Sequence, residues 1–196
     1  MQTYQNDYDF WMQWVFANAF SFFIGLLSFQ TFFITPLVPG IAQWLILRKQ
    51  IIGLSRWWIL TNVAGIILYG LMGGKLAINS GFSDWCNHYT NSFNICAVFS
   101  YSISGAFGGL LAGVQQWFFL RRYVSLFHLR TSWILASTLG WTLGGFIGSF
   151  TLWKTIFTNN FVIGVFAYGL LFGMLNGAIT GVYLIKIIKH NNRSVR

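Results

Sequence analysis

Long apolar runs separated by short polar stretches dominate this chain, and most of the charged residues lie in those stretches. A helix that crosses the hydrocarbon core of a bilayer needs about 20 predominantly apolar residues. The pattern therefore predicts an all-α protein, an integral membrane bundle of six transmembrane helices. The expected spans are residues 10–28, 30–48, 57–77, 96–120, 132–153 and 161–185.

Two short motifs recur at the ends of these runs. The first, Gly-x-x-Gln-Trp-x-x-Leu followed by two cations, occurs at 40–49 and 113–122, with a degenerate copy at 177–186. The second places Trp four residues before Asn or Ser, at 14–18, 58–62 and 133–137. Self-similarity of this kind indicates an internal repeat. We therefore expect three diverged helical hairpins.

Composition supports a membrane protein. Apolar residues make up 56% of the chain and charged residues 8%, whereas a soluble domain carries about 25% charge. Six spans leave no room for a separate soluble domain of ordinary size, so we expect a single membrane domain, 1–196. The polar N-terminus lacks the basic region of a cleaved signal peptide, and we expect it to be retained.

The net charge of +9 is explained by topology. In a six-span arrangement, Lys75 and Lys154 lie on one side of the membrane and the other ten cations on the opposite side. The positive-inside rule then places both termini in the cytoplasm of a multipass inner (plasma) membrane protein. The cations form no stripe or arm, so we expect no nucleic-acid partner. Six tryptophans near span ends suggest an interfacial belt: Trp11, Trp14, Trp57, Trp58, Trp133 and Trp153.

Glycine recurs at a spacing of four in the last three spans, which keeps it on one helix face. This pattern predicts glycine-zipper packing, either within the chain or against a second subunit. The residues are Gly105, Gly109 and Gly113; Gly140, Gly144 and Gly148; and Gly169, Gly173, Gly177 and Gly181.

The repeated motifs also predict a layer of uncharged polar residues. Gln43 and Gln116 each precede a cation by five residues, so both lie roughly 7 Å inward of the cationic boundary. The Trp-to-Asn spacing places one polar residue of each other helix at similar depth. The layer comprises Asn18, Gln43, Asn62, Gln116, Ser137 and Thr180. It either joins the helices by hydrogen bonds or lines a vestibule for a small polar solute.

Catalytic chemistry is absent from the expected spans, which contain no carboxylate and no His. We therefore expect no enzyme, no cofactor and no metal site. Between the third and fourth spans, Cys86 and Cys96 form a candidate disulfide or remain two free thiols. Metal binding by Asp84, Cys86 and His88 is a third alternative, although their spacing is not typical of zinc sites.

The repeated Trp-x-Leu-Ala-Asn and Gly-x-x-Gln-Trp-x-x-Leu-Arg phrases resemble uncharacterised bacterial polytopic membrane proteins built from such hairpins. The resemblance covers residues 11–186 and implies a bacterial membrane protein, without an activity to carry over. The chain is also similar in size, expected topology and aromatic content to the substrate-binding subunits of energy-coupling-factor vitamin transporters.

Two function hypotheses follow. The first is a non-catalytic protein embedded in the lipid bilayer, either a subunit of a membrane complex or a homo-oligomer. The second is a small-solute transporter or channel that uses the uncharged polar layer.

Overall fold

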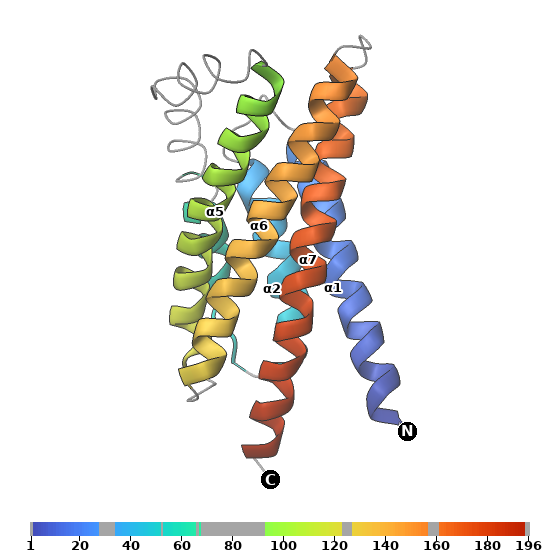
Figure 1. Ribbon diagram of the computed structural model, residues 1–196. Coiled ribbons are helices and arrows are strands. Elements are labelled where there is room, and N and C mark those ends of the chain that lie inside the picture. Colours follow the sequence, from blue (N-terminus) through green and yellow to red (C-terminus); the bar gives the residue numbers. More distant parts are fainter. Residues whose placement is uncertain are drawn as a thin grey trace.

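The computed structural model describes residues 2–27, 34–51, 53–65, 67, 93–122, 127–156 and 161–194. Every regular element in these residues is an α-helix, as the hydrophobic pattern predicts. Five helices carry labels in Figure 1, and a further helical stretch covers 57–65. The labelled helices are α1 (Gln2–Leu27), α2 (Ile34–Leu47), α5 (Phe93–Leu120), α6 (Phe127–Ile156) and α7 (Phe161–Ser194).

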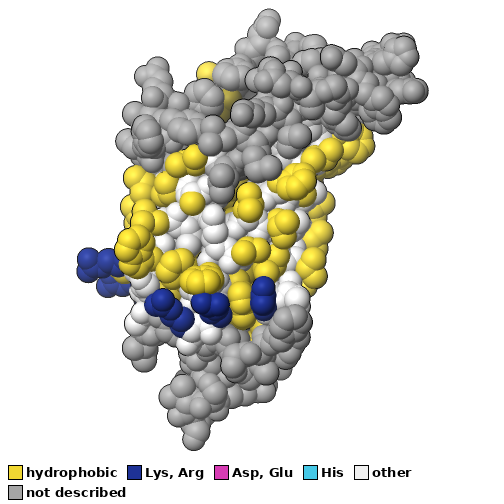
Figure 2. All heavy atoms as spheres, turned by 90° about the vertical axis from the view of Figure 1, so that its left-hand side faces the viewer, with side chains coloured by type: hydrophobic (Ala, Val, Ile, Leu, Met, Phe, Trp, Pro, Cys, Tyr) yellow, Lys and Arg dark blue, Asp and Glu magenta, His cyan; other side chains and the backbone are white. Residues whose placement is uncertain are grey.

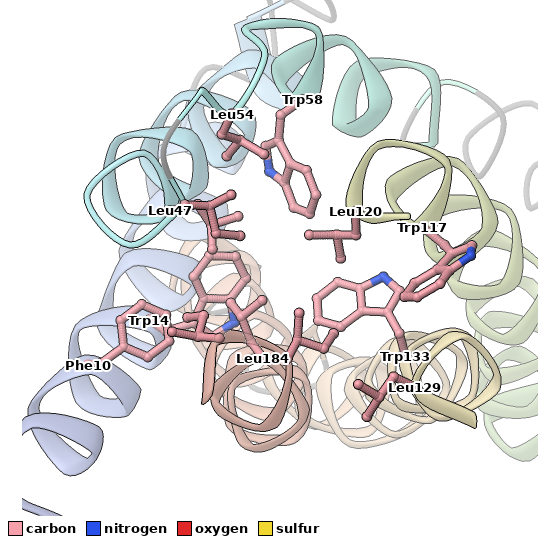
Figure 3. Close-up of a cluster of buried hydrophobic side chains, with 13 residues drawn as sticks. Phe10, Trp14, Leu47, Leu54, Trp58, Trp117, Leu120, Leu129, Trp133 and Leu184 are labelled. Atoms are coloured by element: carbon pink, nitrogen blue, oxygen red, sulfur yellow. The ribbon is translucent and has the colours of Figure 1, made fainter. Parts of the chain in front are cut away.

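The helices form a closed ring. Contacts join α1 to α2, α5 to α6, α6 to α7, and α7 back to α1. The 57–65 helix fits between α2 and α5, because Gly40 of α2 lies against Ile59 and Gly65 lies against Ala112 of α5. Figure 3 shows this order around the bundle, and Figure 1 places both chain termini at the same end. The first and last helices are therefore neighbours in space.

Several helix bounds differ from the sequence prediction. Helix α1 begins at Gln2 rather than residue 10, α6 begins at Phe127 rather than 132, and α7 continues to Ser194 rather than 185. The extensions contain no Gly or Pro that would stop the helix, and those of α6 and α7 add core residues, Leu129, Ile187 and Ile188. Of the span expected at 30–48, the structure describes α2 from Ile34, with Pro39 inside the helix, and residues 30–33 lie outside the described residues.

The third expected span is described only in its first part. Of the span expected at 57–77, the structure describes the helix at 57–65 and residue 67. The rest of that span lies outside the described residues. The expected loop after it lies outside them as far as residue 92, and α5 begins at Phe93.

Three helices in the described residues are long and apolar enough to cross a membrane. Their apolar segments are Val98–Leu120, Leu129–Thr151 and Val162–Lys189, and α2 adds a shorter one, Leu37–Leu47. Large apolar side chains such as Phe20, Leu139 and Phe150 are exposed. Figure 2 shows an apolar surface with a band of Lys and Arg near one end. Length, composition and surface together indicate a membrane protein.

Glycine allows close backbone approach at two of the interfaces. A Cβ added at Gly109 of α5 would lie 2.7 Å from the Ser137 carbonyl oxygen of α6. A Cβ added at Gly173 of α7 would collide with the Asn18 carbonyl oxygen of α1. Such glycines face other helices of the same chain, so a second subunit is not needed to cover them.

A hydrophobic core lies near the cationic end of the ring. Its centre holds one fully buried Trp from each of α1, the 57–65 helix and α6, together with one fully buried Leu from each of α2, α5 and α7. Figure 3 shows these side chains directed into the bundle. They are Trp14, Trp58, Trp133, Leu47, Leu120 and Leu184.

Candidate functional site

The six residues of the expected polar layer are all buried in the bundle. Each comes from a different helix: Asn18 from α1, Gln43 from α2, Asn62 from the 57–65 helix, Gln116 from α5, Ser137 from α6 and Thr180 from α7. Burial of an amide without a hydrogen-bond partner in apolar surroundings destabilises a protein by about 2–7 kcal/mol. The partners of these side chains therefore decide what the layer can do.

Two amide pairs each connect the two helices of an expected hairpin, one pair in the first hairpin and one in the second. Gln43 Nε2 donates a hydrogen bond to Asn18 Oδ1 at 2.7 Å. Gln116 Nε2 donates to Asn62 Oδ1 at 3.4 Å, a longer contact of the same type. The Gln of the first motif thus meets the Asn of the second motif in both cases.

Tryptophan indoles connect one expected hairpin to the next. Trp58 Nε1 donates to Gln43 Oε1 at 3.3 Å, which joins the 57–65 helix to α2. Trp14 Nε1 donates to Thr180 Oγ1 at 3.0 Å, which joins α1 to α7. The second bond closes the ring between the first and last helices.

Local hydrogen bonds within the helices complete the network. Asn18 Nδ2 donates to the Trp14 carbonyl oxygen at 2.8 Å, and Asn62 Nδ2 donates to that of Trp58 at 3.4 Å. A continuous chain of hydrogen bonds therefore runs around most of the bundle. Its members, in order, are Thr180, Trp14, Asn18, Gln43, Trp58, Asn62 and Gln116.

The chain is open between α5 and α6. Trp133 holds the same motif position as Trp14 and Trp58, and its indole is equally buried. By analogy with Trp58 and Gln43, its nitrogen should donate to Gln116. Instead, Trp133 Nε1 has no hydrogen-bond partner in the described part of the chain. In the described residues the network thus ends at Gln116 of α5 and at Thr180 of α7, and α6 supplies none of its members.

The interfacial role expected for three tryptophans is wrong. Trp14, Trp58 and Trp133 are at most 1% exposed, and they pack in the core instead of along the outside. The indoles of Trp14 and Trp58 have acceptors inside the bundle, so burial satisfies both the apolar ring and the N–H group of these two residues. Sequence reasoning missed these residues as members of the polar layer. The available signal was the constant spacing of four between each Trp and the following Asn or Ser.

Three further buried oxygens lie outside the expected layer, and one of them, Gln115 Oε1, faces an outer groove described below. Ser104 Oγ of α5 and Asn176 Oδ1 of α7 have no hydrogen-bond partner in the described residues. Asn176 lies against α6 at Gly140. The main-chain carbonyl oxygen of Asn176 accepts a hydrogen bond from Thr180 Oγ1 at 2.6 Å, so Asn176 adjoins the layer. Thr180 had been expected in the layer, whereas none of these three residues was.

Only one of the two cysteines can be placed. Cys96 is buried in the first turn of α5 and is disulfide-bonded. Cys86, its expected partner, lies outside the described residues, as do Asp84 and His88. The Cys86–Cys96 bridge therefore remains a prediction.

Charge is concentrated at the end of the ring where the tryptophans lie. Arg48, Lys49, Arg56, Arg121 and Arg122 are exposed there, after α2, before the 57–65 helix and after α5. Lys189 of α7 forms an ion pair with Asp7 of α1 near the chain termini. With twelve Lys and Arg against three Asp and no Glu, most cations have no acidic side chain to meet.

The fold and the site define a class: an all-α membrane protein whose buried polar groups are joined in a network of amides, indoles and hydroxyls. No protein-family model, curated protein or solved structure gives a significant match to the chain.

Proposed function

We propose that this protein is a non-catalytic, multipass protein of a bacterial inner membrane that serves as a subunit of a larger membrane assembly. The chain crosses the bilayer six times as three diverged helical hairpins, with both termini in the cytoplasm. The single observation that best supports a non-catalytic role is the pairing of the polar layer. Its amides are bonded to one another and to indoles, which leaves little chemistry for a substrate.

Six spans are supported by the position of both chain termini at the same end (Figure 1) and by the band of cations near one end (Figure 2). Cysteine labelling tests this topology on a Cys86→Ala, Cys96→Ala background. Gln50→Cys, in the exposed turn after α2, should resist an impermeant thiol reagent added outside the cell. Lys154→Cys, near the far end of α6, is the matched control and should react. Outside labelling at position 50 would contradict the proposed orientation.

A subunit role makes a direct prediction about mass. After extraction in a mild detergent and subtraction of the bound detergent, the protein mass of the particle should be well above that of the 22.4 kDa chain, and the partner should be identifiable by mass spectrometry. Because every glycine face with a described contact is covered within the chain, association must use other surfaces. A protein that remains a monomer under all mild extraction conditions would contradict the proposal.

The polar layer can be tested separately with the double variant Gln43→Leu and Gln116→Leu. If the layer only joins helices, the variant should fold and assemble, since interhelical hydrogen bonds in membranes contribute about 0.6 kcal/mol each. Leu is also at home in an apolar bundle. The measurements are the thermal midpoint and the mass of the extracted assembly. Loss of the assembly with the fold retained would give the layer a role beyond internal packing.

A small-solute path is the second candidate function, and the unpaired oxygens of Ser104 and Asn176 favour it. Proteoliposomes loaded with polar solutes of graded size distinguish the two candidates by stopped-flow light scattering. Liposomes that contain a subunit without a solute path should shrink at the same rate as protein-free liposomes loaded with the same solute. A faster rate that Asn176→Leu abolishes would instead support the solute path.

A further inference from the structure

An apolar groove of about 380 Å³ lies on the outside of the ring, between the 57–65 helix and α5. Its volume is within the range of about 300–1,000 Å³ that is usual for small-molecule sites. Several lining side chains are exposed, Trp57 at 63% and Phe118 at 51% among them. The lining consists of Trp57, Leu60, Thr61, Ala64, Val114, Gln115, Phe118 and Phe119.

Two arginines flank the cationic end of this groove. The Arg121 guanidinium carbon lies 3.7 Å from the centroid of the Phe118 ring, so the cation is held over a lining residue. Arg56 directly precedes Trp57, another lining residue. Both arginines are exposed, and neither forms an ion pair with an acidic residue in the described part of the chain. The groove thus combines an apolar trough with a positively charged mouth.

Two polar side chains line the trough itself, Thr61 and Gln115, and the Thr61 hydroxyl donates to the Trp58 carbonyl oxygen of its own helix. Gln115 Oε1 is buried and has no hydrogen-bond partner in the described residues. The other two copies of the motif have Ala42 and Ile179 at this position, so the shared packing does not require an amide. Because no hydrogen bond holds the amide, it can turn to present Nε2 to an acceptor such as an ester carbonyl. Gln115 precedes Arg121 by six residues, which places it about 9 Å further along the helix axis.

We propose that this groove binds one anionic phospholipid, with an acyl chain in the trough and the phosphate at Arg56 and Arg121. Basic sites between membrane helices are suited to anionic lipid head groups, and arginine binds phosphate through charge-assisted hydrogen bonds. The Gln115 amide lies at the depth of the ester groups that follow the phosphate. This site is independent of the proposed subunit role, since a lipid can bind whether or not the protein has partners.

Charge complementarity favours a lipid over a second copy of this chain. A helix laid in the groove would partly bury two arginines, and buried cations need anionic partners. A second copy offers three carboxylates in all, and that of Asp7 already pairs with Lys189. A phospholipid supplies both the apolar chain and the anion.

The test uses the full chain in nanodiscs of equal parts phosphatidylglycerol and phosphatidylcholine. After extraction into detergent, native mass spectrometry counts the lipids that stay bound. The wild-type protein should retain more phosphatidylglycerol than phosphatidylcholine. Arg56→Gln with Arg121→Gln should reduce this preference about thirtyfold, since each juxtamembrane cation contributes about fivefold. Ala64→Trp, which fills the trough, should reduce retention of both lipids.

The charge-matched control is Arg48→Gln with Lys49→Gln, because Arg48 stacks on Trp44 of α2, away from the groove. This variant loses the same two charges and should keep the wild-type preference. Equal losses in the two double variants would overturn the site in favour of diffuse surface charge. Equal retention of the two lipids by wild type would also overturn it. A dimer that Ala64→Trp dissociates would assign the groove to a second copy.

Discussion

At the scale of single residues, Trp58 and Trp133 form a matched pair. Both hold the first position of the Trp-x-x-x-Asn/Ser motif, both are buried in the same core cluster, and their ring centroids lie 6.5 Å apart. They differ in one respect. Trp58 Nε1 donates to Gln43, whereas Trp133 Nε1 has no partner in the described residues. The pair therefore separates the contribution of indole packing from that of the indole hydrogen bond.

We predict that Trp58→Phe destabilises the protein more than Trp133→Phe, by about 0.5–2 kcal/mol. Each variant removes a similar volume from the core, but only Trp58→Phe leaves a bonded acceptor, Gln43 Oε1, without its donor. The free energy of unfolding in mixed micelles measures the difference. Equal losses would show that the indole of Trp58 contributes through packing alone.

The six polar residues predicted from the sequence are buried, but their hydrogen-bond partners could not be predicted from it. Motif spacing selects the depth of each residue, so Gln43 and Asn18 were expected near one another, and they are bonded. The indoles were assigned to the interface, because Trp at span ends is usually amphipathic and lipid-facing. Helix rotation decides between interface and core, and rotation depends on neighbours that a single sequence does not show.

At the scale of helices, glycine sets how closely α5 can approach its neighbours. A Cβ added at Gly105 would collide with the Trp141 carbonyl group of α6, which is backbone and cannot move aside alone. A Cβ added at Gly65 of the 57–65 helix would meet a methyl group, the Cβ of Ala112, at 3.2 Å. The first contact must separate two helices, while the second needs a shift of a few tenths of an ångström.

We predict that alanine at Gly105 is destabilising and that alanine at Gly65 is tolerated. Gly105→Ala should destabilise the protein by about 1–3 kcal/mol through overpacking. Gly65→Ala should be close to neutral, because the gain of about 1 kcal/mol in helix propensity offsets the tighter contact. Thermal unfolding of both variants in the same detergent makes the comparison. A neutral Gly105→Ala would mean that α5 and α6 can move apart freely.

Helix type and order were predictable from the apolar runs, whereas helix ends were not. Helix α7 continues through Lys186 and Lys189 to Ser194, although the apolar run stops earlier. Hydropathy reports where lipid is tolerated, while a helix ends where its backbone meets a breaker or loses its partners. The residues of α7 beyond Lys189 include no Gly or Pro, so the helix continues past the apolar segment.

At the scale of the whole molecule, the first and last helices pack against each other as the other neighbouring helices of the ring do. Helix α7 contacts α1 as α5 contacts α6, and the termini lie at the same end (Figure 1). In each motif copy the first glycine packs on the residue after the motif Trp of the next helix: Gly40 on Ile59, Gly113 on Ile134 and Gly177 on Val15. The three interfaces between hairpins (α2 with the 57–65 helix, α5 with α6, and α7 with α1) are therefore alike. We expect the bundle to fold whichever one of them lacks a connecting loop.

We predict that a circular permutant beginning at Leu54 and ending at Gly53 folds. Gly53 lies in an exposed turn and has a positive φ of 79°. A Gly/Ser linker of about 20 residues has an r.m.s. span of about 25 Å and would join the old termini without crossing the bundle. The permutant should show a cooperative melt by circular dichroism, while a permutant opened inside α5, after Gly108, should not. Failure of the Leu54 permutant would contradict an interchangeable ring.

The bond between Trp14 and Thr180 joins residues 166 positions apart, and this separation orders events during biosynthesis. Synthesis produces α1 first and its neighbour α7 last. Until then, the α1 face that Gly173 and Gly177 later cover has no α7 to pack against, and the Trp14 indole lacks its acceptor. A chain whose synthesis stops before α7 therefore leaves this face of α1 uncovered, where proteases and insertion factors can bind. Packing of α7 against α1 is the step that separates complete molecules from incomplete ones.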